Sequence, residues 1–381
     1  MSTPLLEQLK RWPDLEAPEL VAVDSADRLL LAELKREVSS DSTLLESDLV
    51  VIGDNYGALT LGAISELGFK TVRVHQDALS GELALANNAK LTGVIDFTNF
   101  DLDADLVDGA RIVVMRLPRA LDQLEQWCAL IAAHADDDVH VLAGGRIKHM
   151  TLGMNDVMRQ YFGSVVASLA VQKSRVLRAK KPLAPLAEQA LTQWPKRKRY
   201  DNIDMTVCAQ GGVFSSVNLD IGTRELLAVL DQTPADAGRI IDLGCGTGIL
   251  ATAISKLRPS AHVFASDQSA AAVDSARETV AANKLGERIT VVRDDALSTQ
   301  PDSSADLILF NPPFHSGAAV HADTSVRLFE DAGRVLRPGG ELWVVANRHL
   351  DYRAVLDRAV GETRLVSSSP KFTVTATTKR G

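Results

Sequence analysis

The two halves of this chain contain the same motifs in the same order, and this repetition limits the possible folds more than any other feature. Residues 239–251 read RIIDLGCGTGILA, which is a β-branched run, a loop with three glycines and the apolar start of a helix. Residues 51–61 read VIGDNYGALTL and keep the two outer glycines as Gly53 and Gly57. A strand, a glycine turn and a helix in this order begin many nucleotide-binding α/β folds.

The match continues through four further segments of each half. TVRVHQD corresponds to HVFASDQ, ALANNAKLTG to TVAANKLG, RIVVMRLP to DLILFNPP, and DVHVLAGG to ELWVVAN. Strands that alternate with helices at this spacing are typical of a doubly wound, mostly parallel sheet. The sequence therefore predicts an α/β protein with two tandem Rossmann-like domains that arose by duplication. We expect them at residues 1–180 and 201–381, joined by a basic linker at 181–200.

The glycine loop of the second half has the features of a cofactor site. Its glycines let a ligand approach the backbone, and the helix start adds free amide donors. The next strand, HVFASD, ends in Asp267, whose carboxylate can accept hydrogen bonds from both hydroxyls of a ribose. A dinucleotide fingerprint needs a glycine where this chain has Ile249, so a dinucleotide is disfavoured. Cys245 lies inside the loop, where its small size suits close packing and nothing marks it as a nucleophile.

The fourth strand of the second half runs into Asn311-Pro312-Pro313-Phe314. Two successive prolines fix two φ angles and remove two amide donors, which stiffens the backbone and leaves carbonyls free. The Asn311 side-chain oxygen and the Pro312 carbonyl can then accept both protons of one –NH2 group, and Phe314 can stack on the flat group that carries it. A loop with a capping Asn and a core Phe is the simpler alternative. The position directly after this strand favours the catalytic interpretation.

A planar amino nitrogen is a poor nucleophile because its lone pair is delocalised. Two acceptors on its protons favour pyramidalisation and direct the lone pair at an electrophile, so no strong base is needed before attack. The protein then contributes positioning and electrostatics. The electrophile that matches this chemistry is a sulfonium methyl group.

These motifs together resemble an S-adenosylmethionine-dependent methyltransferase that acts on an amino nitrogen. The stretch GGVFSSVNL at 211–219, followed by Asp220 and a helix, is similar to the segment that precedes the cofactor domain in ribosomal RNA guanine-N2 methyltransferases of the RlmG/RsmC family. The chain length and DSADRLLLAEL at 24–34 look most like the large-subunit members. The resemblance implies methylation of the exocyclic N2 amine of a specific guanine in large-subunit (23S) rRNA.

The resemblance also assigns residues to the cofactor. The loop would hold the methionine part, Asp267 the ribose, and Asp295 with Ala296 the adenine. The full set of expected cofactor-binding residues is Asp242, Gly244, Cys245, Gly246, Gly248, Asp267, Gln268, Asp295, Ala296 and Asn311. The expected catalytic residues are Asn311, Pro312, Pro313 and Phe314.

The first half departs from the second where chemistry would take place. Asn55 stands in place of Gly246, and Val51 in place of Asp242. Gln76 replaces Asp267, unless Asp77 has moved into register, and Arg116-Leu117-Pro118 replaces Asn311-Pro312-Pro313. We therefore expect a degenerate first domain without a working cofactor site, with a role as scaffold, partner surface or substrate contact.

The net charge of −8 argues against a protein that coats nucleic acid over its whole surface. A basic stretch nevertheless lies between Lys173 and Arg199, with Trp194 and Tyr200 beside it. It is either a solvated linker or a contact for phosphate. The RNA-binding candidates are Lys173, Arg175, Lys196, Arg197, Lys198 and Arg199. Methylation of small-subunit (16S) rRNA, protein-glutamine N-methylation and a non-catalytic RNA-binding scaffold remain alternatives.

The composition is that of a globular protein, with 46% hydrophobic residues and no apolar run long enough for a membrane helix. Cys128, Cys208 and Cys245 are far apart and odd in number, which indicates reduced thiols in a cytoplasmic protein. We expect no metal site, no membrane contact and a monomer whose partner is ribosomal RNA, either naked or in an assembly intermediate.

Overall fold

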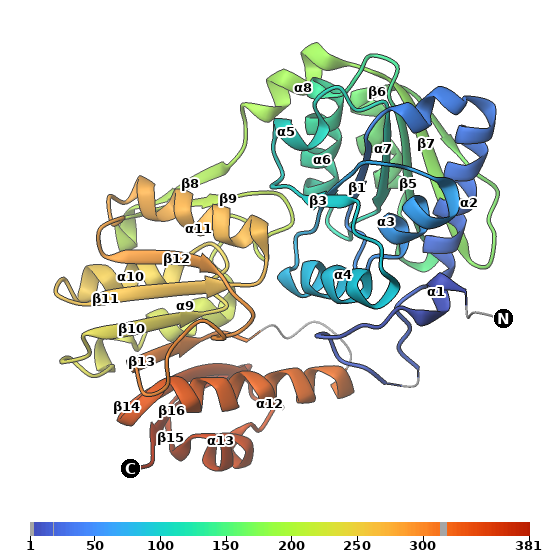
Figure 1. Ribbon diagram of the computed structural model, residues 1–381. Coiled ribbons are helices and arrows are strands. Elements are labelled where there is room, and N and C mark those ends of the chain that lie inside the picture. Colours follow the sequence, from blue (N-terminus) through green and yellow to red (C-terminus); the bar gives the residue numbers. More distant parts are fainter. Residues whose placement is uncertain (1–3, 18, 313–317) are drawn as a thin grey trace. The chain divides into compact units, whose positions relative to one another are not determined.

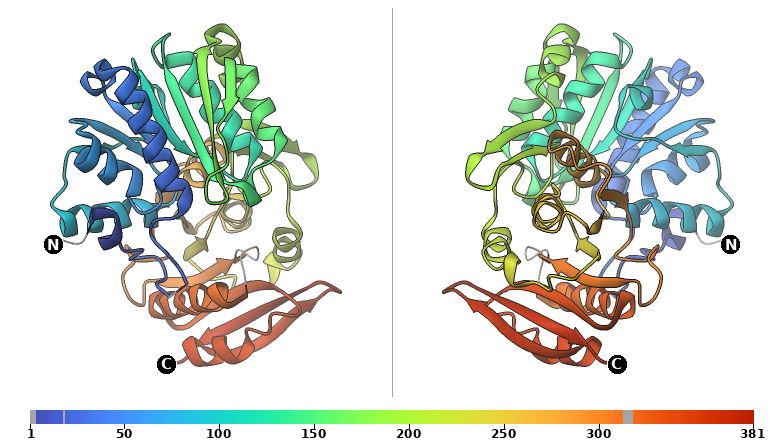
Figure 2. Two further views of the ribbon diagram at one scale, coloured as in Figure 1. Left: turned by 90° about the vertical axis from the view of Figure 1, so that its right-hand side faces the viewer. Right: turned by 90° about the vertical axis from the view of Figure 1, so that its left-hand side faces the viewer.

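The computed structural model describes residues 4–17, 19–312 and 318–381. The chain divides into two compact units, residues 1–194 and 195–381, each built on a seven-stranded sheet (Figure 1). Within each unit, helices cover both faces of the sheet, as the turned views in Figure 2 show. Among the described residues, no helix combines the length and apolar character that crossing a membrane requires.

The first unit has the strand order β3-β2-β1-β4-β5-β7-β6, and β7 runs opposite to the other six strands. The strands are β1 Leu49–Ile52, β2 Val72–His75, β3 Phe97–Asn99, β4 Ile112–Arg116, β5 His140–Arg146, β6 Phe162–Ala167 and β7 Ser174–Pro182. The helices are α1 Leu5–Gln8, α2 Ser25–Ser40, α3 Ala58–Gly62, α4 Leu79–Thr92, α5 Ala104–Val107, α6 Leu121–His134, α7 Leu152–Tyr161 and α8 Ala184–Leu191. One apolar core contains side chains of α1 to α4 and the other those of α5 to α8. Burial on both faces explains why β1 and β4 are almost entirely apolar.

The second unit has the order β12-β11-β10-β13-β14-β16-β15, which repeats the order of the first sheet. Here β16 runs opposite to the other six strands. Its sheet contains β10 Arg239–Leu243, β11 His262–Asp267, β12 Ile289–Arg293, β13 Ala305–Phe310, β14 Leu336–Asn347, β15 Gly361–Ser368 and β16 Phe372–Lys379. The helices are α9 Ile221–Leu227, α10 Ile249–Leu257, α11 Ala270–Ala282, α12 Ala318–Val335 and α13 Arg353–Ala359. The expected pair of tandem Rossmann-like domains is therefore confirmed.

The strand registers confirm the internal alignment at the strand before each glycine loop and at its two neighbours in the sheet. At the fifth matched segment they correct it by two residues: Ile112 pairs with His140 and Leu307 with Glu341, which places His140, and not Asp138, at the position of Glu341. Ile52 pairs with His75 on β2 and with Met115 on β4, while Leu243 pairs with Ser266 and with Phe310. The residues that follow these pairs are therefore equivalent, which places Gln76, and not Asp77, at the position of Asp267. By the same register, Arg116 takes the place of Asn311.

Asn88 in the first unit and Asn283 in the second make equivalent hydrogen bonds. Asn88 accepts a hydrogen bond from the backbone N–H of Lys10 at 2.9 Å and donates to its carbonyl at 2.8 Å. Asn283 makes the same pair of bonds with Thr206, at 3.1 and 2.7 Å. Each asparagine thus ties the segment that precedes the sheet to the helix after the second strand.

The stretch expected as a linker, residues 181–200, contributes to both units. Helix α8 packs on α6 in the first unit. Strand β8, Lys196–Tyr200, pairs antiparallel with β9, Met205–Ala209, in the second. The division between Trp194 and Pro195 thus leaves regular structure on each side of it.

Candidate active site

The glycine loop between β10 and α10 has a left-handed backbone at all three glycines. Gly244, Gly246 and Gly248 have φ angles of 65°, 52° and 74°, a region that side chains with a Cβ rarely adopt. A Cβ at Gly248 would lie 3.1 Å from Cβ of Ala276 on α11, so this glycine permits close packing of two helices. At Gly246, no described atom would lie within 4 Å of a Cβ. The middle of the loop therefore faces open space that a ligand can enter.

Asp242 at the end of β10 and Cys245 within the loop are both buried. The Asp242 carboxylate is buried and accepts a hydrogen bond from the N–H of Ala251 in the first turn of α10, at 2.8 Å. Burial raises the pKa of Asp242 to about 7. Burial also raises the pKa of the Cys245 thiol well above its usual range, which does not suit a nucleophile. Asp242 thus fixes the loop to the helix.

The Asp267 carboxylate lies beside the loop at the end of β11. It accepts hydrogen bonds from the N–H of Gly246 at 2.9 Å and from the N–H of Ser269 at 3.0 Å. Its side chain is half-buried, and Gln268 next to it is exposed. A carboxylate oriented in this way between a glycine loop and a helix start suits a ribose diol.

Asp295 and Ala296 follow β12 at the same edge of the sheet. The N–H of Asp294 donates to the Asp267 carbonyl at 3.0 Å, which brings the two strand ends together. Ala296 is a non-glycine residue with a φ of 58°, and its carbonyl accepts a hydrogen bond from Ser266 Oγ at 3.3 Å. The Asp295 carboxylate pairs with Arg327 of α12, a partner that the sequence motifs did not indicate.

Asn311 follows β13 and is held by the first turn of α9. Its Nδ2 donates to the Asp220 carboxylate at 3.3 and 3.4 Å and to Thr223 Oγ1 at 3.1 Å. Its Oδ1 is buried and has no hydrogen-bond partner among the described residues. A Cβ at Gly222 would lie 2.7 Å from this oxygen, so only glycine leaves room for the side chain. The geometry fixes the amide and leaves its oxygen as an acceptor.

The sequence motifs indicated Asp220 and a helix after it, but not that the first turn of this helix holds the Asn311 amide. Asp220 is the N-cap of α9, and its carboxylate accepts a hydrogen bond from the N–H of Thr223 at 3.1 Å. An Asp directly before the first residue of a helix is a local N-cap pattern that could have been found. Pro312 is buried directly after Asn311, whereas the expected catalytic residues Pro313 and Phe314 lie outside the described residues.

Two family models cover almost all of the chain. The methyltransferase small domain matches residues 204–376, and the RLMG N-terminal domain matches residues 3–183. The ribosomal RNA large subunit methyltransferase G of Streptomyces coelicolor is 36% identical, with 98% of each chain covered. That of Ectopseudomonas mendocina is 36% identical, with 98% of this chain and 97% of the relative covered. The chain belongs to the ribosomal RNA large subunit methyltransferase G family.

Membership makes this chain a methyltransferase, with S-adenosylmethionine as its cofactor. A solved structure with the same two-domain fold is the T. thermophilus 16S rRNA N2 methyltransferase RsmC, in complex with AdoMet and guanosine. It is 20% identical, has a TM-score of 0.71, and the match covers 89% of this chain and 91% of that one. The likeness at this identity supports the fold alone.

In this member of the family, the first unit has a salt bridge where the second has Asn311. Arg116 forms ion pairs with Asp24, at 2.8 Å, and with Asp27. Asp24 is the N-cap of α2 and Asp27 stands three residues later, as Asp220 and Thr223 do on α9. Burial raises the pKa of Asp27 to about 6, against the opposing effect of Arg116. The position equivalent to Asn311 is therefore filled by an internal ion pair.

In and beside the loop between β1 and α3, other residues replace Asp242, Gly246 and Asp267 of the second unit. Asp54 takes over the role of Asp242, since its buried carboxylate accepts hydrogen bonds from the N–H groups of Leu59 at 2.7 Å and Thr60 at 2.8 Å. Asn55 keeps the left-handed conformation of Gly246, with a φ of 60°. Gln76 Nε2 donates to the carbonyl of Gly81 at 3.0 Å, so the first turn of α4 packs on the side chain that stands at the position of Asp267.

Arg197, Lys198 and Arg199 of β8 have partners in their own unit. Arg197 pairs with Glu278 at 2.8 Å, and Arg199 pairs with Asp201 and Asp204. Lys198 Nζ donates to Asn218 at 2.8 Å and lies 4.9 Å from the centroid of the Tyr200 ring. These side chains are exposed, and the ion pairs reduce the charge that they present to a phosphate. The other expected RNA-binding residues, Lys173 and Arg175, lie in the first unit at the start of β7.

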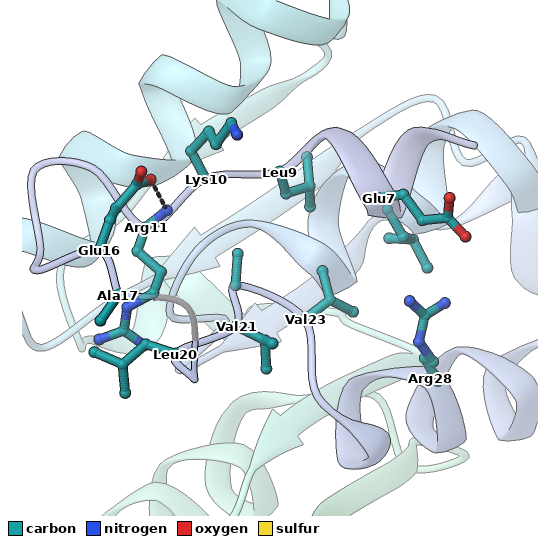
Figure 3. Close-up of a pocket in the computed structure, with 12 residues that line it drawn as sticks. Glu7, Leu9, Lys10, Arg11, Glu16, Ala17, Leu20, Val21, Val23 and Arg28 are labelled. Carbon is teal, nitrogen blue, oxygen red and sulfur yellow. Dashed lines mark hydrogen bonds between the residues drawn. The ribbon is translucent and has the colours of Figure 1, made fainter. Parts of the chain in front are cut away.

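A cavity of about 560 Å³ lies in the first unit, between α1, the loop that follows it and the start of α2 (Figure 3). Glu7 and Arg28 face one another at one side of it, and the backbone of Arg11 donates to Glu16 at 3.0 Å at the other. It contains none of the residues expected to bind cofactor or RNA.

Proposed function

We propose that this protein transfers a methyl group from S-adenosylmethionine to the exocyclic N2 amine of a specific guanine in large-subunit (23S) ribosomal RNA. The observation that carries the proposal is the buried Oδ1 of Asn311, which has no partner among the described residues while the amide nitrogen is held by Asp220 and Thr223. A buried acceptor without a donor is costly unless a ligand supplies one. An amine proton supplies that donor.

The described residues fit the cofactor at three points. Open space above Gly246 admits the methionine part next to the start of α10. The Asp267 carboxylate and exposed Gln268 suit the ribose, and Asp295 with Ala296 lies at the neighbouring strand end for the adenine. Asp242 contributes by tying the loop to α10, and the small buried Cys245 packs within the loop. When bound, S-adenosylmethionine supplies a methyl group on a positively charged sulfur.

The chain's own residues orient the amine. Asn311 Oδ1 accepts one proton of the –NH2 group and the Pro312 carbonyl accepts the other, which directs the nitrogen lone pair away from both. The proton leaves for solvent only after the nitrogen–carbon bond has formed, so neither residue acts as a strong base. Preorganised acceptors of this kind contribute several kcal/mol to a transition state. Asp220 and Thr223 are positioning residues that keep the amide from rotating.

The experiment uses the full-length protein, labelled S-adenosylmethionine, and protein-free 23S and 16S rRNA from a strain that lacks the gene. We expect label in 23S rRNA and N2-methylguanosine after nuclease digestion. Label in 16S rRNA alone would reassign the subunit. In a parallel reaction with intact ribosomes from the same strain, label on a protein glutamine and none on RNA would replace the substrate. Asn311→Ala should bind cofactor with unchanged affinity in calorimetry and lose at least about a hundredfold in turnover. Unchanged turnover would refute the role of Asn311.

A further inference from the structure

The turn after β12 is shaped by hydrogen bonds among its own residues. The buried Asp294 carboxylate accepts hydrogen bonds from the Ser298 hydroxyl at 2.6 Å and from the N–H and the hydroxyl of Thr299 at 3.1 and 2.7 Å. The carboxylate of the next residue, Asp295, is half-buried and makes none of these bonds. The backbone at Asp295 is therefore held in place independently of the Asp295 side chain.

Two arginines on one face of α12 contact this turn. Arg334 donates from Nη1 to the Gln300 carbonyl and from Nη2 to the Leu297 carbonyl, each at 2.8 Å. Arg327 stands seven residues earlier on the helix, a spacing that places both side chains on the same face. Among the described residues, Arg327 bonds to the Asp295 carboxylate and to no backbone group. Arg334 thus ties the helix to the turn, while Arg327 holds a single side chain.

The ion pair fixes the direction of the Asp295 carboxylate more than it stabilises the fold. The exposed fractions of the two side chains are 47% for Arg327 and 20% for Asp295. A pair this exposed contributes little to folding, because solvent screens the charges and both side chains lose freedom. Arg327 Nη2 donates to Oδ1 of Asp295, and no described residue donates to Oδ2. One oxygen is therefore held, and the other remains an acceptor for a ligand.

A carboxylate oxygen that is held in one direction can distinguish the purine rings. The 6-amine of adenine is a hydrogen-bond donor, and an ionised carboxylate only accepts. A purine with a carbonyl at position 6 presents a second acceptor, which the carboxylate repels. A carboxylate that rotates freely can turn to solvent and avoid this repulsion, whereas one that is held cannot. Selectivity for the amine therefore depends on what holds Asp295.

We propose that Arg327 is a positioning residue that directs the Asp295 carboxylate at the 6-amine of adenine and so sets the selectivity of the cofactor site for adenine. This inference rests on the assignment of Asp295 to adenine in the proposed function. Arg327 acts through Asp295 and need not touch the cofactor. It stands 32 residues after Asp295, on a helix that carries none of the residues expected to bind cofactor.

The test measures the affinity of the full-length protein for two ligands in calorimetry. One is S-adenosylhomocysteine, and the other is S-inosylhomocysteine, in which a carbonyl replaces the 6-amine. Wild type should bind S-adenosylhomocysteine at least about tenfold more tightly. Arg327→Gln should lose about tenfold in affinity for S-adenosylhomocysteine and less than about twofold for S-inosylhomocysteine, so the preference nearly disappears. Arg327→Lys keeps the charge without the planar fork and should retain part of the preference.

Arg337→Gln is the matched control. Arg337 pairs with Asp306 at 2.9 Å and has an exposed fraction of 50%, close to that of Arg327. Asp306 lies at the start of β13, whereas Asn311 follows the end of that strand. The control should bind both ligands as wild type does.

The outcomes separate the role of Arg327 from the proposed function. Equal losses for both ligands in Arg327→Gln would show a merely structural role, and an unchanged preference would overturn the proposal as well. Asp295→Asn should abolish the preference, and a preference that persists there would remove Asp295 from the adenine and Arg327 with it. No RNA enters the measurement. Wild-type protein that shows the expected preference but methylates no rRNA would therefore refute the proposed function and leave the role of Arg327 standing.

Discussion

Gly222→Ala offers the sharpest test of how Asn311 is held. The new Cβ would lie 2.7 Å from Asn311 Oδ1 and 3.2 Å from its Cγ. Carbon and oxygen do not approach this closely without a bond, so the Asn311 amide must move or rotate. Gly222 is the second residue of α9 and has no positive φ, so alanine suits its backbone.

The expected effect on catalysis is large because the displacement falls on the amine acceptor. A shift of about 1 Å in a positioning group costs on the order of a hundredfold in rate, which is about 2.7 kcal/mol. The free energy of unfolding should fall by no more than about 2 kcal/mol, because the gain in helix propensity of about 1 kcal/mol offsets part of a packing cost of about 1 to 3 kcal/mol. Cofactor affinity should not change, since Gly222 lies outside the glycine loop.

The assay measures kcat with 23S rRNA, calorimetric affinity for S-adenosylmethionine, and thermal unfolding. Gly286→Ala is the matched control, because its Cβ would meet no described atom within 4 Å and its φ is not positive. We expect the control to behave as wild type in all three measurements. A Gly222→Ala enzyme with kcat within twofold of wild type would show that the Asn311 amide is not held where its hydrogen bonds place it.

Three further predictions concern the acids and the ion pair. Asp267→Ala should weaken S-adenosylmethionine binding at least about tenfold in calorimetry, because two ribose hydroxyls lose their acceptor; unchanged affinity would remove it from the site. Arg116→Ala should lower the urea-measured free energy of unfolding of the first unit by about 3 kcal/mol, since Asp24 and Asp27 lose their partner, with methyl transfer per folded molecule retained. Burial raises the pKa of Asp54 to about 7. Between about pH 4 and pH 7 the folded protein therefore keeps a proton on Asp54 that the unfolded chain has lost. The free energy of unfolding of the wild type should fall across this pH range relative to that of Asp54→Asn. A pH-independent difference would contradict that pKa.

The sequence was sufficient for the features that depend on local order. Glycines, strand-end acids and the Asn-Pro pair follow one another along the chain, and the strand registers confirm the alignment that they predicted. The role of Asp54 could not be read in this way. Alignment shows that Val51 lacks the acid of Asp242, but only the folded loop shows a carboxylate three residues later that bonds to the same helix start.

Charge was the harder property to predict, because contiguous residues are more visible than residues that pairing brings together. Lys196–Arg199 are adjacent in the sequence, yet Arg197 and Arg199 are neutralised by acids from elsewhere in the unit. Arg146 and Arg175 instead lie on two different strands, β5 and β7, and their buried Nε atoms have no hydrogen-bond partner among the described residues. Whether a cation has a partner depends on tertiary contacts that composition does not record.

The ion pair of Arg116 also explains why the first site could not be restored by one change. Arg116→Asn would recreate the side chain of Asn311 but leave Asp27 buried where the second unit has Thr223, so a carboxylate would lose its cation. Asn55 and Gln76 would still stand in place of Gly246 and Asp267, with α4 packed on Gln76. Each residue of the closed site now stabilises the first unit in its present form, so a return to cofactor binding requires several simultaneous substitutions. We therefore expect one molecule of S-adenosylmethionine per chain in calorimetry, and a stoichiometry of two would refute this account of the first unit.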